Sequence, residues 1–114
     1  MFLRFLKSMA ASFALLLCFA SAAHAVCEPG WCRDERITTF YISDHLYLWT
    51  SGDESQLNCD LFQGDYLTLR RNHQSFDAIY AFLLSAYAQD EPVMVRVYEG
   101  SDGCQIAYAR GSRP

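Results

Sequence analysis

Lysine is nearly missing from this sequence: the only one is Lys7, and almost all of the positive charge comes from arginine. Without the first 25 residues, whose removal is argued below, seven arginines stand against thirteen acidic residues, a formal charge of 7 − 13 = −6 with neutral histidines. A nucleic-acid site needs a basic footprint, and an anionic membrane surface repels an acidic chain. The charge argues against both partners and leaves small polar, neutral or cationic partners open.

The sequence also lacks the local signatures of common catalytic sites. Asp44 precedes His45, but adjacent residues form no relay by themselves, and no nucleophile elbow accompanies them. The neighbouring acids Asp53 and Glu54 are expected to be exposed turn charges, with no spacing typical of paired catalytic carboxylates. We therefore predict that the protein is not an enzyme and that it needs no cofactor.

Long apolar runs are limited to residues 8–20, which follow a basic start and precede the small-x-small pattern Ala23-His24-Ala25. This order is typical of a cleaved signal peptide, and the run is short for a membrane span of about 20 residues, which is the alternative. We interpret residues 1–25 as a signal peptide and residues 26–114 as one exported domain. It would reside in the periplasm or outside the cell, with no membrane attachment after cleavage.

Cysteine is scarce but even in number after the predicted cleavage site, with Cys27, Cys32, Cys59 and Cys104. An even count in a small exported domain predicts two disulfides, for which three pairings are possible. We favour Cys27–Cys32, which closes a short loop, and Cys59–Cys104, which ties the middle of the chain to its end. A zinc site is the alternative, but the sequence offers no second closely spaced pair of ligands. We therefore expect no metal.

Hydrophobic periodicity predicts one helix. Apolar side chains recur at helical spacing from Phe76 to Tyr87, and Ser75 is the predicted N-cap. Because Pro92 cannot continue the helical hydrogen bonds, the helix is expected to end near Gln89.

Alternating and β-branched segments predict five main strands, three before the helix and two after it. They cover residues 36–42, 46–50, 66–70, 92–99 and 105–110. Residues 26–35 are expected to form turns, 51–55 a mobile solvent-facing loop, and 56–62 a short strand that runs into a bend. The order β-β-β-α-β-β predicts a mainly β fold, an OB-like five-stranded Greek-key barrel with one helix. An open α+β antiparallel sheet with the helix packed on it is the alternative.

Two tryptophans are candidate ligand contacts. Trp31 lies in a predicted turn beside a predicted disulfide, where core burial is difficult, and Trp49 precedes the polar loop. Aromatic rings stack on sugars or anchor protein interfaces, although for any single ring a place in the core is the commoner use. Arg96 lies on the strand face opposite the valines, where a guanidinium binds an anion or, more often, forms a surface salt bridge.

The segment FDAIYAFLLSAYAQDEPVMVRVYEG resembles the binding subunits of bacterial AB toxins of the subtilase cytotoxin and typhoid toxin kind, and RDERITTFYI resembles their first strand. The chain is also similar to small exported bacterial proteins of unknown function, in Cys59, in LLSA and in GCQIAY. The resemblance implies an OB-like barrel, a ring-shaped homopentamer and recognition of host glycans, often sialylated. Where those subunits hold sialic acid with a serine, this chain has Arg33, which is the third candidate ligand residue.

Together these observations predict a secreted, non-catalytic binding module with a glycan or protein partner. A homo-oligomer is compatible with this prediction, and the toxin-like form of it implies a pentamer. The alternative is a periplasmic structural or inhibitor-like domain that binds an envelope protein.

Overall fold

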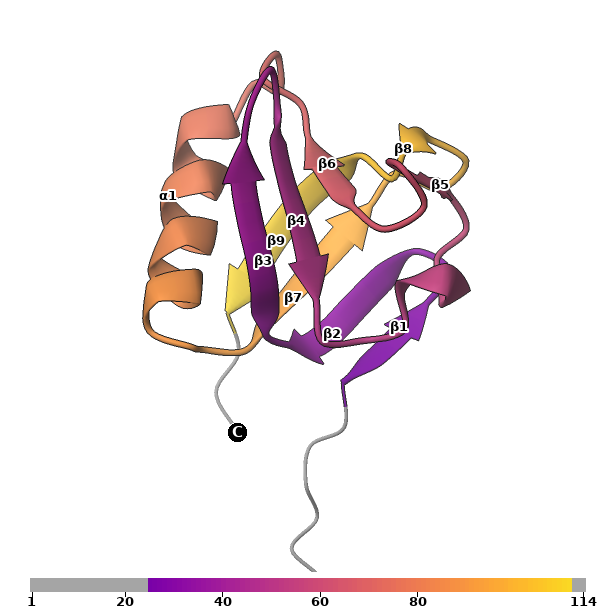
Figure 1. Cartoon of the computed structure of the whole chain (residues 1–114), viewed down its shortest axis with the longest axis horizontal. Coiled ribbons are helices and arrows are strands. Elements are labelled where there is room, and N and C mark those ends of the chain that lie inside the picture. Colours follow the sequence, from indigo (N-terminus) through magenta and orange to yellow (C-terminus); the bar gives the residue numbers. More distant parts are fainter. Residues whose placement is uncertain (1–24, 112–114) are drawn as a thin grey trace, which may run out of the picture.

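The computed structural model describes residues 25–111 (Figure 1). Apart from Ala25, the predicted signal peptide lies outside the described residues, so its cleavage stays a prediction. Within the described part of the chain, no helix is long and apolar enough to cross a membrane.

The chain is mainly β with one α-helix, as the sequence predicts. Its elements are, in order, β1 (Val26–Glu28), β2 (Trp31–Glu35), β3 (Ile37–Ile42), β4 (Leu46–Thr50), the 3-10 turn η1 (Glu54–Gln56), β5 (Asp60–Leu61), β6 (Leu67–Leu69), α1 (Phe76–Ala88), β7 (Val93–Val97), β8 (Asp102–Gly103) and β9 (Ile106–Gly111). In Figure 1, α1 stands beside β3 on one side of the molecule, and β5, β8 and η1 lie on the other.

Two antiparallel sheets carry the fold, one in the order β1-β2-β7-β9 and one in the order β3-β4-β6. The first sheet leads directly into the second, because only Arg36 separates β2 from β3. At the other junction, Thr68 of β6 forms a single parallel bridge with Gln105, and its N–H donates to the carbonyl of Cys104 at 3.2 Å. The strand order around the molecule is therefore the Greek-key order expected of an OB-like barrel, with one narrow seam between β6 and β9.

The core lies between the sheets and α1. Its fully buried aliphatic side chains come from four strands and the helix: Leu46, Leu48, Leu67, Leu69, Leu83, Val93, Val95 and Ile106. Burial of each such side chain contributes about 1.5–3 kcal/mol.

The helix begins and ends where the sequence predicts, with Ser75 as N-cap and Gln89 as C-cap, but the predicted capping bond is wrong. The Ser75 side chain makes no cap hydrogen bond. Instead, its backbone N–H donates to Nδ1 of His73 at 3.0 Å. A histidine two residues upstream therefore orders the approach to the helix.

Both favoured disulfides are present. Cys27–Cys32 joins residues that are directly opposite in the β1–β2 hairpin. Cys59–Cys104 joins the segment before β5 to the segment between β8 and β9, over 45 positions of sequence.

Three loop predictions are corrected by the structure. Residues 26–35 form the β1–β2 hairpin, in which only Pro29-Gly30 is the turn. Residues 51–55 are not uniformly solvent-facing, because Glu54 is only 4% exposed. Most of the strand predicted at 56–62 is irregular, with β5 reduced to two residues.

Candidate functional site

The outer face of β2, β7 and β9 gathers polar and aromatic side chains. Side chains alternate between the two faces of a strand, so residues two apart on each of these strands share a face. The pairing places Trp31 opposite Arg96, and Arg96 opposite Tyr108. We name this surface the arginine face; it consists of Trp31, Arg33, Arg96, Tyr108 and Arg110.

A cavity of about 430 Å³ opens on the arginine face. All five residues of the face line it, and Asp34 and Met94 complete the lining. This volume falls within the range of about 300–1,000 Å³ that is usual for small-molecule sites.

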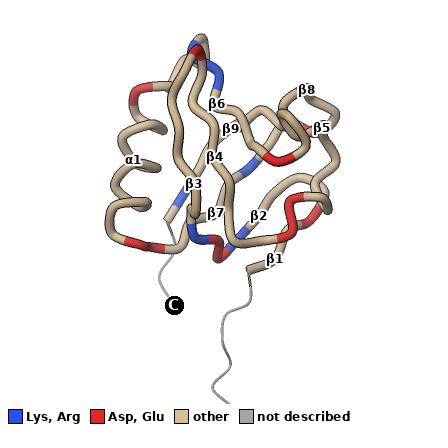
Figure 2. Tube along the Cα trace, viewed as in Figure 1, with Lys and Arg blue, Asp and Glu red and all other residues tan. Residues whose placement is uncertain are grey.

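The arginine face is positively charged although the chain is acidic overall. Among the described residues, the ion pairs are Arg36–Asp90 and Asp44–His45, so Arg33, Arg96 and Arg110 are not in any. The surface salt bridge expected for Arg96 is therefore wrong within the described residues. Figure 2 shows basic residues along these strands and acidic residues near η1 and the turn before β6.

Two contacts hold the guanidinium groups in position. The guanidinium carbon of Arg33 lies 5.1 Å from the centre of the Trp31 ring, a cation–π contact. The head group of Arg96 covers Gly30, where an added Cβ would lie 3.0 Å from Cζ of Arg96. The turn glycine thus allows Arg96 to lie close to the backbone beside Trp31.

The structure brings together two of the three predicted ligand residues. Trp31 and Arg33 share the arginine face, whereas Trp49 projects from β4 and lines a different cavity. Tyr108 and Arg110 were missed as site residues, because only the register between β7 and β9 places them beside Arg96.

The cavity at Trp49 is acidic. It measures about 270 Å³ and is lined by Trp49, Gly52, Asp53, Glu54, Ser55, Leu61, Gly64 and Asp65. The Trp49 ring is 42% exposed and meets the Tyr66 ring edge-on at 6.1 Å. We name this hollow the acidic cavity.

Two glutamates are buried at or beside the acidic cavity, and neither is in an ion pair among the described residues. Glu35 is fully buried, and its Oε2 accepts a hydrogen bond from Ser51 Oγ at 3.0 Å. Glu54 Oε1 accepts from the hydroxyl of Thr50 at 2.7 Å and from the Thr50 backbone N–H. Burial raises the pKa of both carboxyl groups, and for Glu54 burial together with the negative charge of Glu35 raises the pKa to about 7.

Gly52 provides the space for the Glu35 carboxyl group. A Cβ on Gly52 would lie 1.8 Å from Oε1 of Glu35, which no relaxed structure tolerates. Gly52→Ala is therefore expected to lower the free energy of unfolding by about 2 kcal/mol, because overpacking displaces a buried polar group. Urea denaturation measures this change.

Gly111→Ala is the matched control for this substitution, since its Cβ would meet Phe82 at an ordinary 3.5 Å. Equal stability of the two variants would contradict the packing of Glu35 on Gly52.

One group of possible metal ligands is compact. Among the described residues, only Cys27, Cys32 and Glu35 place three ligand atoms within 4.8 Å of one another. The two sulfur atoms are bonded to each other, so neither offers the thiolate that a metal needs. This donor set does not fit a metal in the disulfide form.

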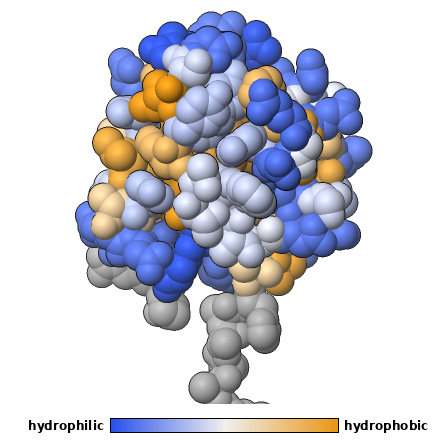
Figure 3. All heavy atoms as spheres, in the orientation of Figure 1, coloured by the Kyte–Doolittle hydropathy of each residue, from blue (hydrophilic) through white to orange (hydrophobic). Residues whose placement is uncertain are grey.

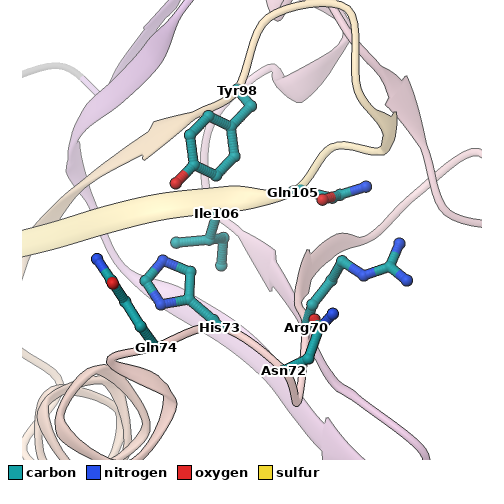
Figure 4. A pocket seen from close by; sticks show the side chains of 7 residues that line it. All are labelled: Arg70, Asn72, His73, Gln74, Tyr98, Gln105 and Ile106. Carbon is teal, nitrogen blue, oxygen red and sulfur yellow. The ribbon is translucent and has the colours of Figure 1, made fainter.

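A third hollow, of about 280 Å³, lies where the loop before α1 meets β9 (Figure 4). Its lining is rich in amides and consists of Arg70, Asn72, His73, Gln74, Tyr98, Gln105 and Ile106. His73 Nε2 donates to the carbonyl of Ala107 at 2.8 Å while Nδ1 accepts from Ser75. Because both ring nitrogens form hydrogen bonds to the backbone, His73 links the loop before α1 to β9.

His45 is also structural. Its Nδ1 accepts the backbone N–H of Arg71 at 2.9 Å, and Asp44 Oδ1 accepts from the Tyr47 hydroxyl at 2.8 Å. The hydrogen bond between Asp44 and Tyr47 lowers the pKa of Asp44, and burial together with this bond raises the pKa of Tyr47 to about 12.

In comparisons with protein-family models, curated proteins and solved structures, nothing matched this chain.

Proposed function

We propose that this chain is an exported, non-catalytic binding module that holds a carboxylate-bearing glycan on the arginine face. The observation that carries the proposal is the grouping of three arginines, none in an ion pair among the described residues, around the rings of Trp31 and Tyr108 at one cavity. The resemblance to toxin binding subunits supports a glycan as the ligand, and the arginines support an acidic one.

The chemistry of the face suits such a ligand. A guanidinium group presents a planar fork of donors that matches the two oxygens of a carboxylate. Exposed aromatic rings stack on the apolar faces of sugars. Arg96, which lies between Trp31 and Tyr108 in the sheet, would bind the acid while the two rings bind the sugar.

A non-catalytic role is supported by how the chain uses its ionisable groups. Glu35 is fully buried, so a substrate cannot reach it. His45 and His73 both direct a ring nitrogen to a backbone N–H. The cysteines Cys27 and Cys32 are tied up in a disulfide.

Arg96→Ala is expected to weaken binding of carboxylated glycans by about 10- to 100-fold, which is the usual effect of removing a hydrogen bond to a charged group. The measurement is a glycan array that carries carboxylated, sulfated and neutral glycans, followed by calorimetry on the best ligand. Binding of the wild type should fall as salt is added, since the attraction is between charges.

Arg70→Ala is the matched control, because Arg70 is exposed and lines the amide-rich hollow instead. Equal binding of neutral and carboxylated glycans, or no binding to any glycan on the array, would contradict the proposal.

A second candidate is binding to a protein, an envelope partner or further copies of this chain, and an exposed apolar patch favours it. Phe40 of β3 stacks on Tyr87 of α1 at 5.6 Å, and the exposed Leu84 lies on the same helix face one turn earlier. Figure 3 shows hydrophobic side chains over α1 and β3. Light scattering of the oxidised protein tests self-association, and a pentamer would favour the toxin-like form of the proposal.

A further inference from the structure

The acidic cavity carries a charge opposite to that of the arginine face. Asp53 and Asp65 line it together with Glu54, and no arginine or lysine is among its lining residues. The exposed ring of Trp49 forms part of the same wall. An aromatic ring beside carboxylates is a combination that attracts cations through both the ring face and the charges.

One carboxyl oxygen of a residue that lines the acidic cavity has no partner among the described residues. Glu54 is 4% exposed, and its Oε2 is buried without a hydrogen bond in the described part of the chain, whereas Oε1 is fully used by Thr50. A buried polar atom without a partner is rare in folded proteins and destabilises them unless a ligand or water satisfies it. Glu54 lines the cavity, so a cationic group bound there lies beside its carboxyl group.

The spacing of the acids selects the kind of cation. Asp53, Glu54 and Asp65 do not form a compact ligand group, since the only three-ligand group among the described residues is Cys27, Cys32 and Glu35. A metal ion needs oxygens that converge at about 2.0–2.6 Å from one point. An organic cation spreads its donors and carbon atoms over several ångströms, and an aromatic wall favours it further.

We propose that the acidic cavity binds an organic ammonium group, with Trp49 against its carbon atoms and Asp65 and Glu54 toward its charge. The volume of the cavity, about 270 Å³, is sufficient for one alkylammonium group. This inference is independent of the arginine face, which takes ligands of the opposite charge.

Binding is coupled to the release of a proton. The charges that act on Glu54 are acidic, Glu35 on β2 and Asp65 before β6, whereas Thr50 donates two hydrogen bonds to its Oε1. Burial, and after it the charges of Glu35 and Asp65, raise the pKa of Glu54 to about 7, so below that pH the bound cation replaces a proton, which passes to solvent. The balance is Glu54 carboxylic acid plus ammonium giving a carboxylate–ammonium pair and one free proton.

Calorimetry with butylammonium tests the site, and butanol is the neutral probe of matched shape. Butylammonium should bind about tenfold more tightly at about pH 8 than at about pH 6, because Glu54 must lose its proton. Butanol should not bind at either pH. Equal heats from the two probes, or the absence of any heat from butylammonium, would overturn the proposal.

Two variants separate the role of the site from folding. Glu54→Gln should weaken butylammonium binding and remove its pH dependence, and the exposed Asp65→Asn should weaken it about fivefold. Asp77→Asn is the matched control, because Asp77 lies on α1 and does not line this cavity. This variant should bind butylammonium as the wild type does. Unchanged affinity in Asp65→Asn would overturn the proposal even if Glu54→Gln did not fold.

A peptide with one lysine, compared with the same peptide carrying norleucine, identifies the source of the ammonium group. Tighter binding of the lysine peptide than of butylammonium assigns the site to a protein side chain. Equal affinity for both assigns it to small amines. Either result supports an ammonium site, and binding of the norleucine peptide with the affinity of the lysine peptide would contradict it.

Discussion

Replacing both Cys59 and Cys104 by serine is expected to destabilise the oxidised protein by about 4 kcal/mol, the largest effect that we expect from any covalent change. The bridge closes a loop over 45 positions of sequence, so its loss frees much of the unfolded chain. Its position in the fold adds to the effect, because the carbonyl of the buried Cys104 accepts one of the few bonds across the β6–β9 seam. Urea denaturation under oxidising conditions measures the difference.

The double variant Cys27→Ser/Cys32→Ser is the control, because that bridge closes a loop over only 5 positions. The same chain-entropy relation gives about 2 kcal/mol for it. A loss of equal size in the two double variants would show that loop length does not determine how these bridges stabilise the protein.

The free energy of unfolding of the wild type is expected to fall by up to about 3 kcal/mol as the pH rises from about 4.5 to about 7. The cause is Glu54, whose pKa is raised from 4.5 to about 7 in the fold. In this window the native state binds a proton that the unfolded chain has already released. Stability is therefore unaffected below the window, declines through it, and levels off above it.

Glu35 acts in the same direction, because its pKa is also raised by burial. Asp44 and Asp53 act in the opposite direction at lower pH, since hydrogen bonds lower the pKa of both. Their contribution is present above the ordinary aspartate pKa of 3.8 and is lost as the pH falls further. The two effects occur in different pH ranges and can be measured separately.

Thermal unfolding of the wild type and of Glu54→Gln across this pH range isolates the contribution of Glu54. The amide keeps the shape of the side chain but does not titrate, so most of the decline should disappear. Asp53→Asn, one position away and exposed, should leave it in place. If the decline in stability persists in Glu54→Gln, Glu54 is not its source.

The helix and the longest strands were predictable because they depend on near neighbours. The apolar spacing and Pro92 fix α1 to within one residue, and β4 was predicted with its observed bounds. The disulfide pairing followed from loop lengths, although three pairings were possible. Trp31 was recognised as a candidate because it is an aromatic residue in a predicted turn, and Arg33 because the resemblance to toxin binding subunits aligns it with their ligand-holding serine.

The burial of Glu35 could not be predicted, because it follows from a bulge. Strict alternation along β2 would place Cys32 and Glu35 on opposite faces. The structure has a register shift between them against β7, with Asp34 in the left-handed region at φ 55°. This extra residue turns Glu35 inward with Cys32, beside Gly52 and the loop that carries Glu54.

By itself, the sequence determined the one helix, the order of the main strands and the face on which Arg96 lies, because helical and strand periods act over a few residues. Only the tertiary structure decided which residues meet across strands. Trp31, Arg96 and Tyr108 become neighbours through the β2–β7 and β7–β9 pairings, which join segments far apart in the chain. The arginine face depends on these pairings, and the bulge in β2 brings Glu35 beside the loop of the acidic cavity; local sequence patterns carry little information about pairing or bulges.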